Sequence, residues 1–390
     1  MKNTWDVIIV GGGPAGSRAA EVIAREGYSV IVLEKKKVIG EPNHCGEGIS
    51  MHCLKEIGIK TRQSWIIREV KGARLIFPNK ATIYFTQKGF CIDRPSFDRF
   101  LSQRAYLLGA IIHTAERVRR ISSERSRWIV EVETPEGFKE YYSRYLLGAG
   151  GALCPVAEYM GQRSKILPAF QYKFQANTAS TELEDSYLQF HHHEDFAGGY
   201  AWVFHRGKEI SVGAGTTYEL KKRLERFCTR IGLDPKKKIK VEGGPIAFLR
   251  RPLKIAASRA LLAGDAGGFI YPLTKGGVHG ACWSGRIAGE VIVNALKSGN
   301  SYVLSEYTKR VSDYPCRDRL HLMVPQAFFR FDNRIVNTIG KIMDRKEYKE
   351  IPVGRFLRHF LARPTPRLLW GIAVGFLVQR FYHHSAKFAW

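Results

Sequence analysis

The first forty residues contain the feature that most constrains the fold. An apolar run at 5–10 leads directly into Gly-Gly-Gly-Pro-Ala-Gly at 11–16, and residues 17–26 have the pattern of a helix. A second apolar run at 28–33 ends at Glu34. This order of strand, glycine turn, helix, strand and acid is typical of a βαβ dinucleotide-binding unit. We therefore predict a Rossmann-like α/β domain at the N-terminus.

Each part of this segment has a physical role in nucleotide binding. Gly11 makes the tight turn, Gly13 lets a pyrophosphate approach the backbone, and Gly16 lets the helix pack closely on the strand. Glu34 stands 18 positions after Gly16, where a carboxylate can accept a hydrogen bond from a ribose hydroxyl. The complete order favours a nucleotide site over a glycine-rich turn that binds nothing.

A second segment far downstream indicates which dinucleotide is bound. A short apolar run at 260–263 precedes Gly264-Asp265, and a helix is predicted from about Val278 to Leu296. Asp265 can accept a hydrogen bond from a ribityl hydroxyl, and the helix N-terminus can stabilise negative charge on a reduced ring. Together with the N-terminal unit, this segment predicts FAD.

The remaining pattern predicts a split chain. At 390 residues the chain is too long for one simple core. We predict an α/β protein in which a Rossmann-like FAD-binding domain is interleaved with an antiparallel β-sheet substrate domain, followed by a helical C-terminal region. The expected bounds are 1–73, 93–167 and 255–299 for the FAD-binding domain, 74–92 and 168–254 for the β-rich domain, and 300–390 for the helical region.

The cysteines and histidines do not predict a metal site. The seven cysteines are scattered and form no C-x-x-C pair, so zinc and cysteine-ligated iron–sulfur sites are not expected. Free thiols suit a reducing cytoplasm, and no signal peptide is expected before the N-terminal unit. The consecutive histidines at 191–193 would point to opposite faces of a strand, and we interpret them as solvated strand-end residues.

The charge predicts an anionic partner. The net charge is +25, yet no nucleic-acid-binding motif is present, which favours an anionic membrane surface. After Glu350 the chain has no acidic residue, and the apolar run 368–378 is too short to span a bilayer. A helix at 365–382 is predicted either to lie in the membrane interface or to pack on the protein's own core, and the charge favours the membrane. We thus expect a cytoplasmic, peripherally membrane-associated protein.

Five segments together carry a resemblance to a known family. They are Gly11–Gly16, Pro42-x-x-Cys45-Gly46, Asp93-Arg94-x-x-Phe97-Asp98, Gly264-Asp265 followed by Pro272-Leu273-Thr274 and Gly276-Gly277, and Tyr200-Ala201-Trp202-Val203-Phe204. Over residues 1–300 the chain resembles the geranylgeranyl reductase family of FAD-dependent oxidoreductases, in the para-hydroxybenzoate-hydroxylase-like fold group. The last of the five segments is similar to the family's Tyr-x-Trp-x-Phe-Pro substrate-cavity motif.

The resemblance implies reduction of isolated C=C bonds in a prenyl chain or prenyl lipid. Such an alkene needs a proton at one carbon and a hydride from flavin N5 at the other, in a dry apolar pocket. Cys45 is a candidate proton donor, since a thiol with an ordinary pKa near 8.5 carries a proton at neutral pH. The adjacent His44 is the second candidate catalytic residue. Tyr200, Trp202 and Phe204 alternate along a strand, so they share one face that can line a prenyl tunnel.

The implied cofactor-binding residues come from four of the five segments and from the end of the second strand. They are Gly11, Gly13, Pro14, Ala15, Gly16, Glu34, Lys35, Cys45, Gly46, Arg94, Gly264, Asp265, Gly276 and Gly277. The sequence departs from the family pattern at two positions: His205 replaces the motif's proline, and Gly150 replaces an aspartate near the flavin pyrophosphate.

Two other functions remain open at this point. One is a flavin monooxygenase or halogenase on the same fold, and the other is a membrane-docked electron carrier to quinone. The electron donor is also open, because no second strand–Gly-x-Gly–helix unit is visible. NAD(P)H and a redox donor protein such as ferredoxin both remain candidates.

Overall fold

The computed structural model describes residues 3–178 and 186–347, together with residues 366, 370–371, 373–375 and 377–378. The chain divides into two compact units. The first combines Met1–Asn43, Arg94–Ile166 and Ile246–Arg319, and the second combines His44–Asp93, Leu167–Pro245 and Leu320–Trp390. Relative to the domains expected from the sequence, residues 44–73 belong to the second unit, and residues 246–254 and 300–319 belong to the first. Residues 320–390 are grouped with the second unit.

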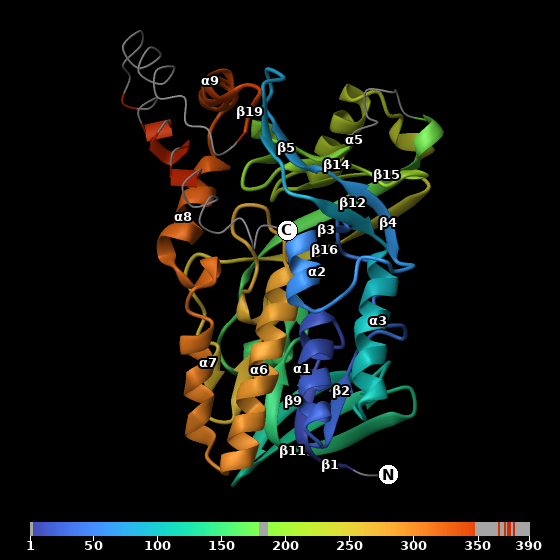
Figure 1. Cartoon of the computed structure of the whole chain (residues 1–390), viewed down its shortest axis with the longest axis vertical. Coiled ribbons are helices and arrows are strands. Elements are labelled where there is room, and N and C mark those ends of the chain that lie inside the picture. The colour runs from blue at the N-terminus through green and yellow to red at the C-terminus, as the bar shows by residue number, and fades with distance from the viewer. Residues whose placement is uncertain are drawn as a thin grey trace. The chain divides into compact units, whose positions relative to one another are not determined.

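The first unit is built on a sheet with a parallel centre (Figure 1). β1 (Thr4–Val10) lies between β2 (Val30–Leu33) and β11 (Gly137–Gly148), and both pairings are parallel. All four residues of β2 are buried, as its apolar run predicts for a central parallel strand. The remaining strands are β8 (Ile111–His113), β9 (Arg117–Glu124), β10 (Arg127–Thr134), β17 (Ala256–Ala257) and β18 (Ala260–Leu262). The predicted Rossmann-like α/β fold is confirmed.

Two helices of this unit pack unusually closely. α1 (Pro14–Arg25) lies beside α6 (Val278–Ser298) in Figure 1. A Cβ added at Gly285 of α6 would lie 2.2 Å from the backbone oxygen of Ala15. Glycine is therefore required for the two backbones to approach. The other helices are α3 (Arg94–Leu107), α4 (Pro155–Tyr159) and α7 (Ser305–Arg310).

The second unit is built on an eight-stranded sheet of order β16-β12-β15-β14-β13-β5-β6-β19. Its strands are β5 (Gly72–Ile76), β6 (Thr82–Phe85), β12 (Lys165–Gln175), β13 (Tyr187–His191), β14 (Ala201–His205), β15 (Glu209–Gly215), β16 (Lys240–Phe248) and β19 (Lys346–Glu347). The β13–β5 and β19–β6 pairings are parallel, whereas β12, β15, β14 and β13 pair antiparallel in that order. The expected antiparallel sheet is therefore mixed at one end.

Smaller elements complete the second unit. A separate antiparallel sheet has the order β3-β7-β4, and the helices α2, α5, α8 and α9 lie between strands in the chain. These elements are β3 (Gly48–Ser50), α2 (Met51–Glu56), β4 (Ile66–Val70), β7 (Gly89–Ile92), α5 (Leu220–Arg230), α8 (Arg319–Phe328) and α9 (Asn333–Met343). The C-terminal region, expected to be only helical, also supplies β19, which pairs with Ile83 and Tyr84 of β6.

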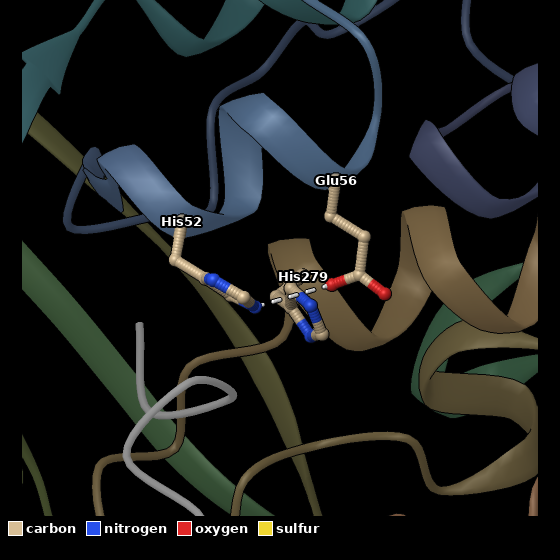
Figure 2. Close-up of side chains that lie close together, drawn as sticks. All are labelled: His52, Glu56 and His279. Atoms are coloured by element: carbon tan, nitrogen blue, oxygen red, sulfur yellow. Dashed lines mark ion pairs between the residues drawn. The ribbon is translucent and has the colours of Figure 1, made fainter.

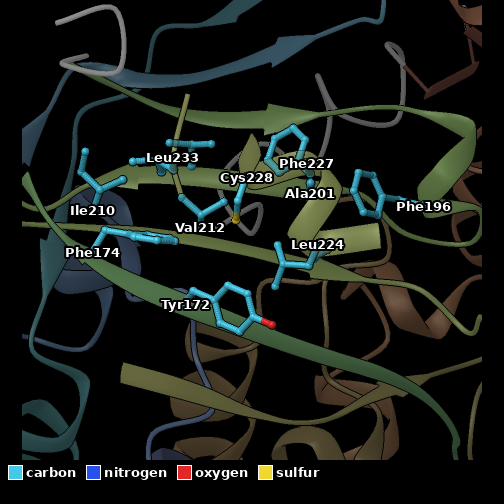
Figure 3. Packing of buried hydrophobic residues seen from close by; sticks show 12 residues of the cluster. Tyr172, Phe174, Phe196, Ala201, Ile210, Val212, Leu224, Phe227, Cys228 and Leu233 are labelled. Atoms are coloured by element: carbon cyan, nitrogen blue, oxygen red, sulfur yellow. The ribbon is translucent and has the colours of Figure 1, made fainter. Parts of the chain in front are cut away.

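One face of the large sheet packs against α5 and forms an apolar core with it (Figure 3). Tyr172 and Phe174 of β12, and Val212 of β15, pack there against Leu224 and Phe227 of α5. Because successive residues of a strand point to opposite faces, the residues between them face the other side of the sheet.

His192 corrects the interpretation of the three histidines as solvated. Its side chain is buried, with its ring against Phe328 and Phe329. Its Nε2 lies 3.1 Å from the Phe328 backbone oxygen. Burial lowers the pKa of His192 to about 4. Alternation alone cannot reveal this burial, because α8 comes from the far end of the chain.

The predicted helix at 365–382 lies largely outside the described residues. Its described residues are helical, and Val374 is buried while Trp370 is 58% exposed. A Cβ at Gly371 would lie 2.5 Å from Ile335 of α9, so one face of the segment packs on the protein. Among the described parts of the chain, no helix is long and apolar enough to cross a membrane.

We predict that Gly285→Ala destabilises the first unit even though alanine favours helices by about 1 kcal/mol. The added methyl group meets the Ala15 backbone, and overpacking of this kind costs about 1–3 kcal/mol. The matched control is Asn294→Ala on an exposed position of the same helix. Urea unfolding should show a loss for Gly285→Ala and little change for the control. Equal midpoints would contradict the close helix contact.

Candidate active site

The glycine turn of the first unit leaves a stretch of backbone open. Gly11 has φ +109°, and a Cβ there would lie 2.5 Å from the Ala149 backbone oxygen. A Cβ at Gly16 would lie 1.9 Å from the Gly11 oxygen, whereas a Cβ at Gly13 would meet nothing within 4 Å. Gly11 and Gly16 are therefore needed for packing. Gly13 instead faces open space at the N-terminus of α1, where a helix stabilises a phosphate.

Glu34 is held at the end of β2 with its carboxylate pointing to the turn. Its Oε2 accepts a hydrogen bond from the Gly12 N–H at 2.8 Å, and its Oε1 accepts one from the Lys36 N–H at 2.9 Å. The residue is only 8% exposed. A carboxylate has further lone pairs for a ribose hydroxyl, so this geometry fits the adenosine side of a dinucleotide. The neighbouring Lys35 is exposed.

Asp265 lies beside the start of α6. Burial raises the pKa of Asp265 to about 6, and the positive charge of Arg94 acts against this rise. Its Oδ1 would lie 3.0 Å from a Cβ at Gly277, the N-cap residue of α6. Arg94 is itself paired with Asp98, Nε to Oδ1, at 2.7 Å. A half-buried acid next to a helix N-terminus fits an acceptor for ribityl hydroxyls.

The residues of the first unit fit the chemical groups of FAD. An open glycine turn, an oriented Glu34 and a partly buried Asp265 all belong to this unit. They match the needs of pyrophosphate, ribose and ribityl groups respectively. Gly150, which replaces the aspartate of the family pattern, contributes only backbone atoms here. It precedes a short turn at Gly151–Leu153 and packs on Cys154.

The second unit brings Cys45 to the face of the large sheet opposite α5. A Cβ at Gly46 would lie 3.0 Å from Cε2 of Phe204 and 3.5 Å from Nε1 of Trp202. Burial raises the pKa of Tyr200, and Tyr200 is close enough to Cys45 for a thiolate there to raise that pKa further. The structure thus places the Cys45 segment and the three predicted aromatic residues together.

The aromatic residues form a continuous surface, which we call the aromatic face: Tyr200, Trp202 and Phe204 of β14 with Phe190 of β13. Ring centroids are 5.3 Å apart for Phe190–Tyr200, 5.4 Å for Phe190–Phe204 and 6.2 Å for Tyr200–Trp202. Phe190 was missed by sequence reasoning, although its strand was predicted. The missing information was the register, which sets Phe190 opposite Trp202.

The other predicted residues of this unit have different surroundings. The His44 side chain is exposed, and its Nδ1 contacts the Gly243 backbone oxygen. His205, the departure from the family motif, ends β14 and accepts a hydrogen bond from Arg68 through its backbone oxygen at 3.2 Å. Figure 2 shows α2, which follows the Cys45 segment, with its i,i+4 ion pair of His52 and Glu56. A catalytic role for Cys45 or His44 stays a prediction.

Comparisons with known proteins agree with this geometry. Residues 4–227 match the FAD binding domain family. A digeranylgeranylglycerophospholipid reductase of Thermoplasma volcanium is 30% identical over 367 residues, covering 87% of this chain and 91% of the relative. A second such reductase, from Methanopyrus kandleri, is 29% identical and covers 90% and 93%. The chain belongs to the geranylgeranyl reductase family.

Solved structures are consistent with this assignment. A geranylgeranyl bacteriochlorophyll reductase-like protein of Thermoplasma acidophilum has a TM-score of 0.83 and 25% identity, covering 96% of this chain and all of the other. The flavin-dependent halogenase CmlS has a TM-score of 0.67 at 18% identity, covering 93% of this chain and 70% of that one. The second likeness shows a shared fold alone. The family member described here is an FAD-dependent oxidoreductase.

We predict that Glu34→Ala weakens FAD binding about 10- to 100-fold. A hydrogen bond to a charged group contributes about 1.5–3 kcal/mol, which corresponds to that range. Isothermal titration of apoprotein with FAD measures the change. Glu124→Ala, an exposed carboxylate of β9, is the control and should bind FAD like the wild type. Unchanged affinity in Glu34→Ala would contradict the assignment of this carboxylate to the cofactor.

Proposed function

We propose that this enzyme reduces isolated C=C bonds in the prenyl chains of a glycerophospholipid. The observation that carries the proposal is the Cys45–Gly46 segment lying against the aromatic face. An apolar surface beside a polarisable thiol suits an alkene that has no carbonyl to hold it. The names of the relatives, digeranylgeranylglycerophospholipid reductases, support this substrate class.

The reaction sets clear demands on the chain's own residues. One carbon of the alkene receives a hydride and the other a proton, so the π bond is replaced by two C–H bonds. FAD, once reduced, is the hydride source. The aromatic face binds the chain and excludes water, while the Cys45 thiol holds the proton beside it. The Glu47 N–H donates to Cys45 Sγ at 3.2 Å, which orients the sulfur and supports the thiolate after proton transfer.

We predict that Cys45→Ser lowers turnover far more than FAD content. Dithionite-reduced enzyme is mixed with a geranylgeranylated glycerophospholipid, and mass spectrometry measures the gain of two hydrogens per reduced bond. Cys228→Ala is the control, because Cys228 lies on α5 and is buried in the apolar core on the opposite face of the sheet. If Cys45→Ser and Cys228→Ala turn over equally, Cys45 is only a packing residue. No mass gain with wild-type enzyme would contradict the proposed activity.

We also propose that the enzyme docks on an anionic membrane, where such a lipid resides. Trp370 and Leu377 of the C-terminal segment are 58% and 39% exposed, while Val374 between them is buried. The segment therefore has an outer apolar side in addition to its inner contact with α9. The sequence after Glu350 adds basic residues without any acid: Arg355, Arg358, Arg363, Arg367, Arg380 and Lys387. Each is worth about 1 kcal/mol near an anionic surface.

Replacing both Trp370 and Leu377 by serine is predicted to make membrane binding fully salt-sensitive. Basic residues would still attract anionic vesicles, but burial of apolar surface, which salt does not screen, is lost. Flotation with phosphatidylglycerol vesicles at low and high salt measures this. Tyr302→Ser is the control, since Tyr302 is 86% exposed but lies in the first unit. Equal salt-resistant flotation of the double variant and the control would contradict docking through this segment.

A further inference from the structure

Gln171 occupies a buried position between the Cys45 segment and the aromatic face. Its side-chain oxygen accepts a hydrogen bond from Nε1 of Trp202 at 3.1 Å. Its Nε2 donates to the Cys45 backbone oxygen and to Glu242 Oε2, each at 3.0 Å. The residue is 2% exposed. One acceptor and two donors are therefore engaged at once, so the amide has a single favourable orientation.

The sheet is built to permit this contact. Gln171 of β12 and Trp202 of β14 both pair with Gly213 of β15, so the three residues form one row across the sheet. A Cβ at Gly213 would lie 2.1 Å from Cζ2 of Trp202 and 2.8 Å from Cβ of Gln171. Any side chain at this position would occupy the space that the indole needs. Gly213 thus lets Trp202 lie across β15 and reach Gln171.

A second set of contacts holds the other side of Cys45. We call it the Glu47 cluster: Glu47, Lys173, Arg206 and Glu242, all buried. Glu47 Oε2 lies 2.9 Å from both Lys173 Nζ and Arg206 NH1, and Lys173 Nζ lies 3.3 Å from Glu242 Oε2. Two cations thus face two carboxylates, which a buried site requires.

The Glu47 cluster also explains an unfavourable backbone conformation. Glu47 has φ +71°, a left-handed conformation that non-glycine residues seldom adopt. The ion pairs to Lys173 and Arg206 hold its side chain, and its N–H donates to the Cys45 sulfur. Cys45 is therefore held at its sulfur through Glu47 and at its carbonyl through Gln171.

We propose that Gln171 is a positioning residue that keeps the Cys45 thiol at a fixed place relative to Trp202 and the aromatic face. The proposal deepens the proposed function, because it takes the Cys45 segment as part of the active site. If a prenyl chain lies on the aromatic face, the distance from a given double bond to the thiol then depends on this amide. Misplacing a reacting group by about 1 Å costs on the order of 100-fold in rate.

The test replaces Gln171 by methionine, which has a similar unbranched shape but forms none of these hydrogen bonds. The matched control is Gln189→Met. Gln189 is also buried in this sheet, where it contacts His191, and it is next to Phe190 in sequence, so it belongs to the face opposite the aromatic one. Both variants are first compared for FAD content and melting temperature.

The first readout does not depend on the substrate. Cys45 is partly exposed and the other six cysteines are buried, so iodoacetamide applied to the native holoenzyme labels Cys45, and peptide mass spectrometry gives the rate. We expect labelling to be at least about threefold faster in Gln171→Met than in the wild type, and unchanged in Gln189→Met. Unchanged labelling in Gln171→Met, or the same increase in both variants, would overturn the proposal whether or not prenyl lipids are reduced.

The second readout is turnover with the prenylated lipid, at equal FAD content. For Gln171→Met we expect kcat to fall about 10- to 100-fold, with KM changing much less. Trp202→Phe keeps an aromatic ring but removes the indole N–H, and it should also accelerate the labelling of Cys45. In the double variant the two effects should not add. Additive effects would mean that Gln171 and Trp202 act separately, which contradicts the proposal.

Discussion

The alternation of side chains along three neighbouring strands is the constraint on which the second unit depends. β12, β15 and β14 direct one set of residues into the apolar core beneath α5 and the other set to the opposite face. The core side stabilises the sheet. The other side is thereby free to carry aromatic rings, Gln171 and the buried charges of the Glu47 cluster. A shift of one residue in any of these strands would exchange the two sets.

The first unit depends on a different constraint, the close approach of backbones around the glycine turn. Gly11 packs on the end of β11 and Gly16 packs on Gly11, while Gly285 of α6 packs on Ala15 of α1. These contacts fix the N-terminus of α1 against β11 and α6, while the Gly12 N–H holds the Glu34 carboxylate at the same turn. The cofactor-binding residues therefore need little rearrangement to meet a phosphate, a ribose or a ribityl chain, which lowers the entropy lost on binding.

Local signals were sufficient to predict the parts of the site that lie within one segment. The glycine turn, Glu34 and Gly264-Asp265 are each read from a few adjacent residues, and the alternation of Tyr200, Trp202 and Phe204 gives their shared face. Local signals do not reveal Phe190, Gln171 or the Glu47 cluster. These residues are brought together only by the register of strands that are distant in sequence. The burial of His192 and the short strand β19 were missed for the same reason.

The charge arrangement of the site also depends on contacts between residues that are distant in sequence. Glu47 appears in the sequence as one more acid in a glycine-rich segment, yet the fold buries it beside Lys173 and Arg206. A strongly basic chain thus contains a locally balanced set of buried charges next to its thiol. A buried charge without a partner would be costly in this position. Each charged residue of the Glu47 cluster therefore depends on the others, which the composition of the chain does not reveal.

Flavin reoxidation without oxygen tests whether a prenyl lipid is the electron acceptor of this flavoenzyme. The bound flavin is reduced anaerobically, and its absorbance is followed after adding, in separate experiments, a prenylated glycerophospholipid, a prenyl diphosphate or a quinone. We expect the prenylated lipid to restore the oxidised spectrum faster than the prenyl diphosphate or the quinone. Rapid reoxidation by quinone, with none by the prenylated lipid, would contradict this assignment.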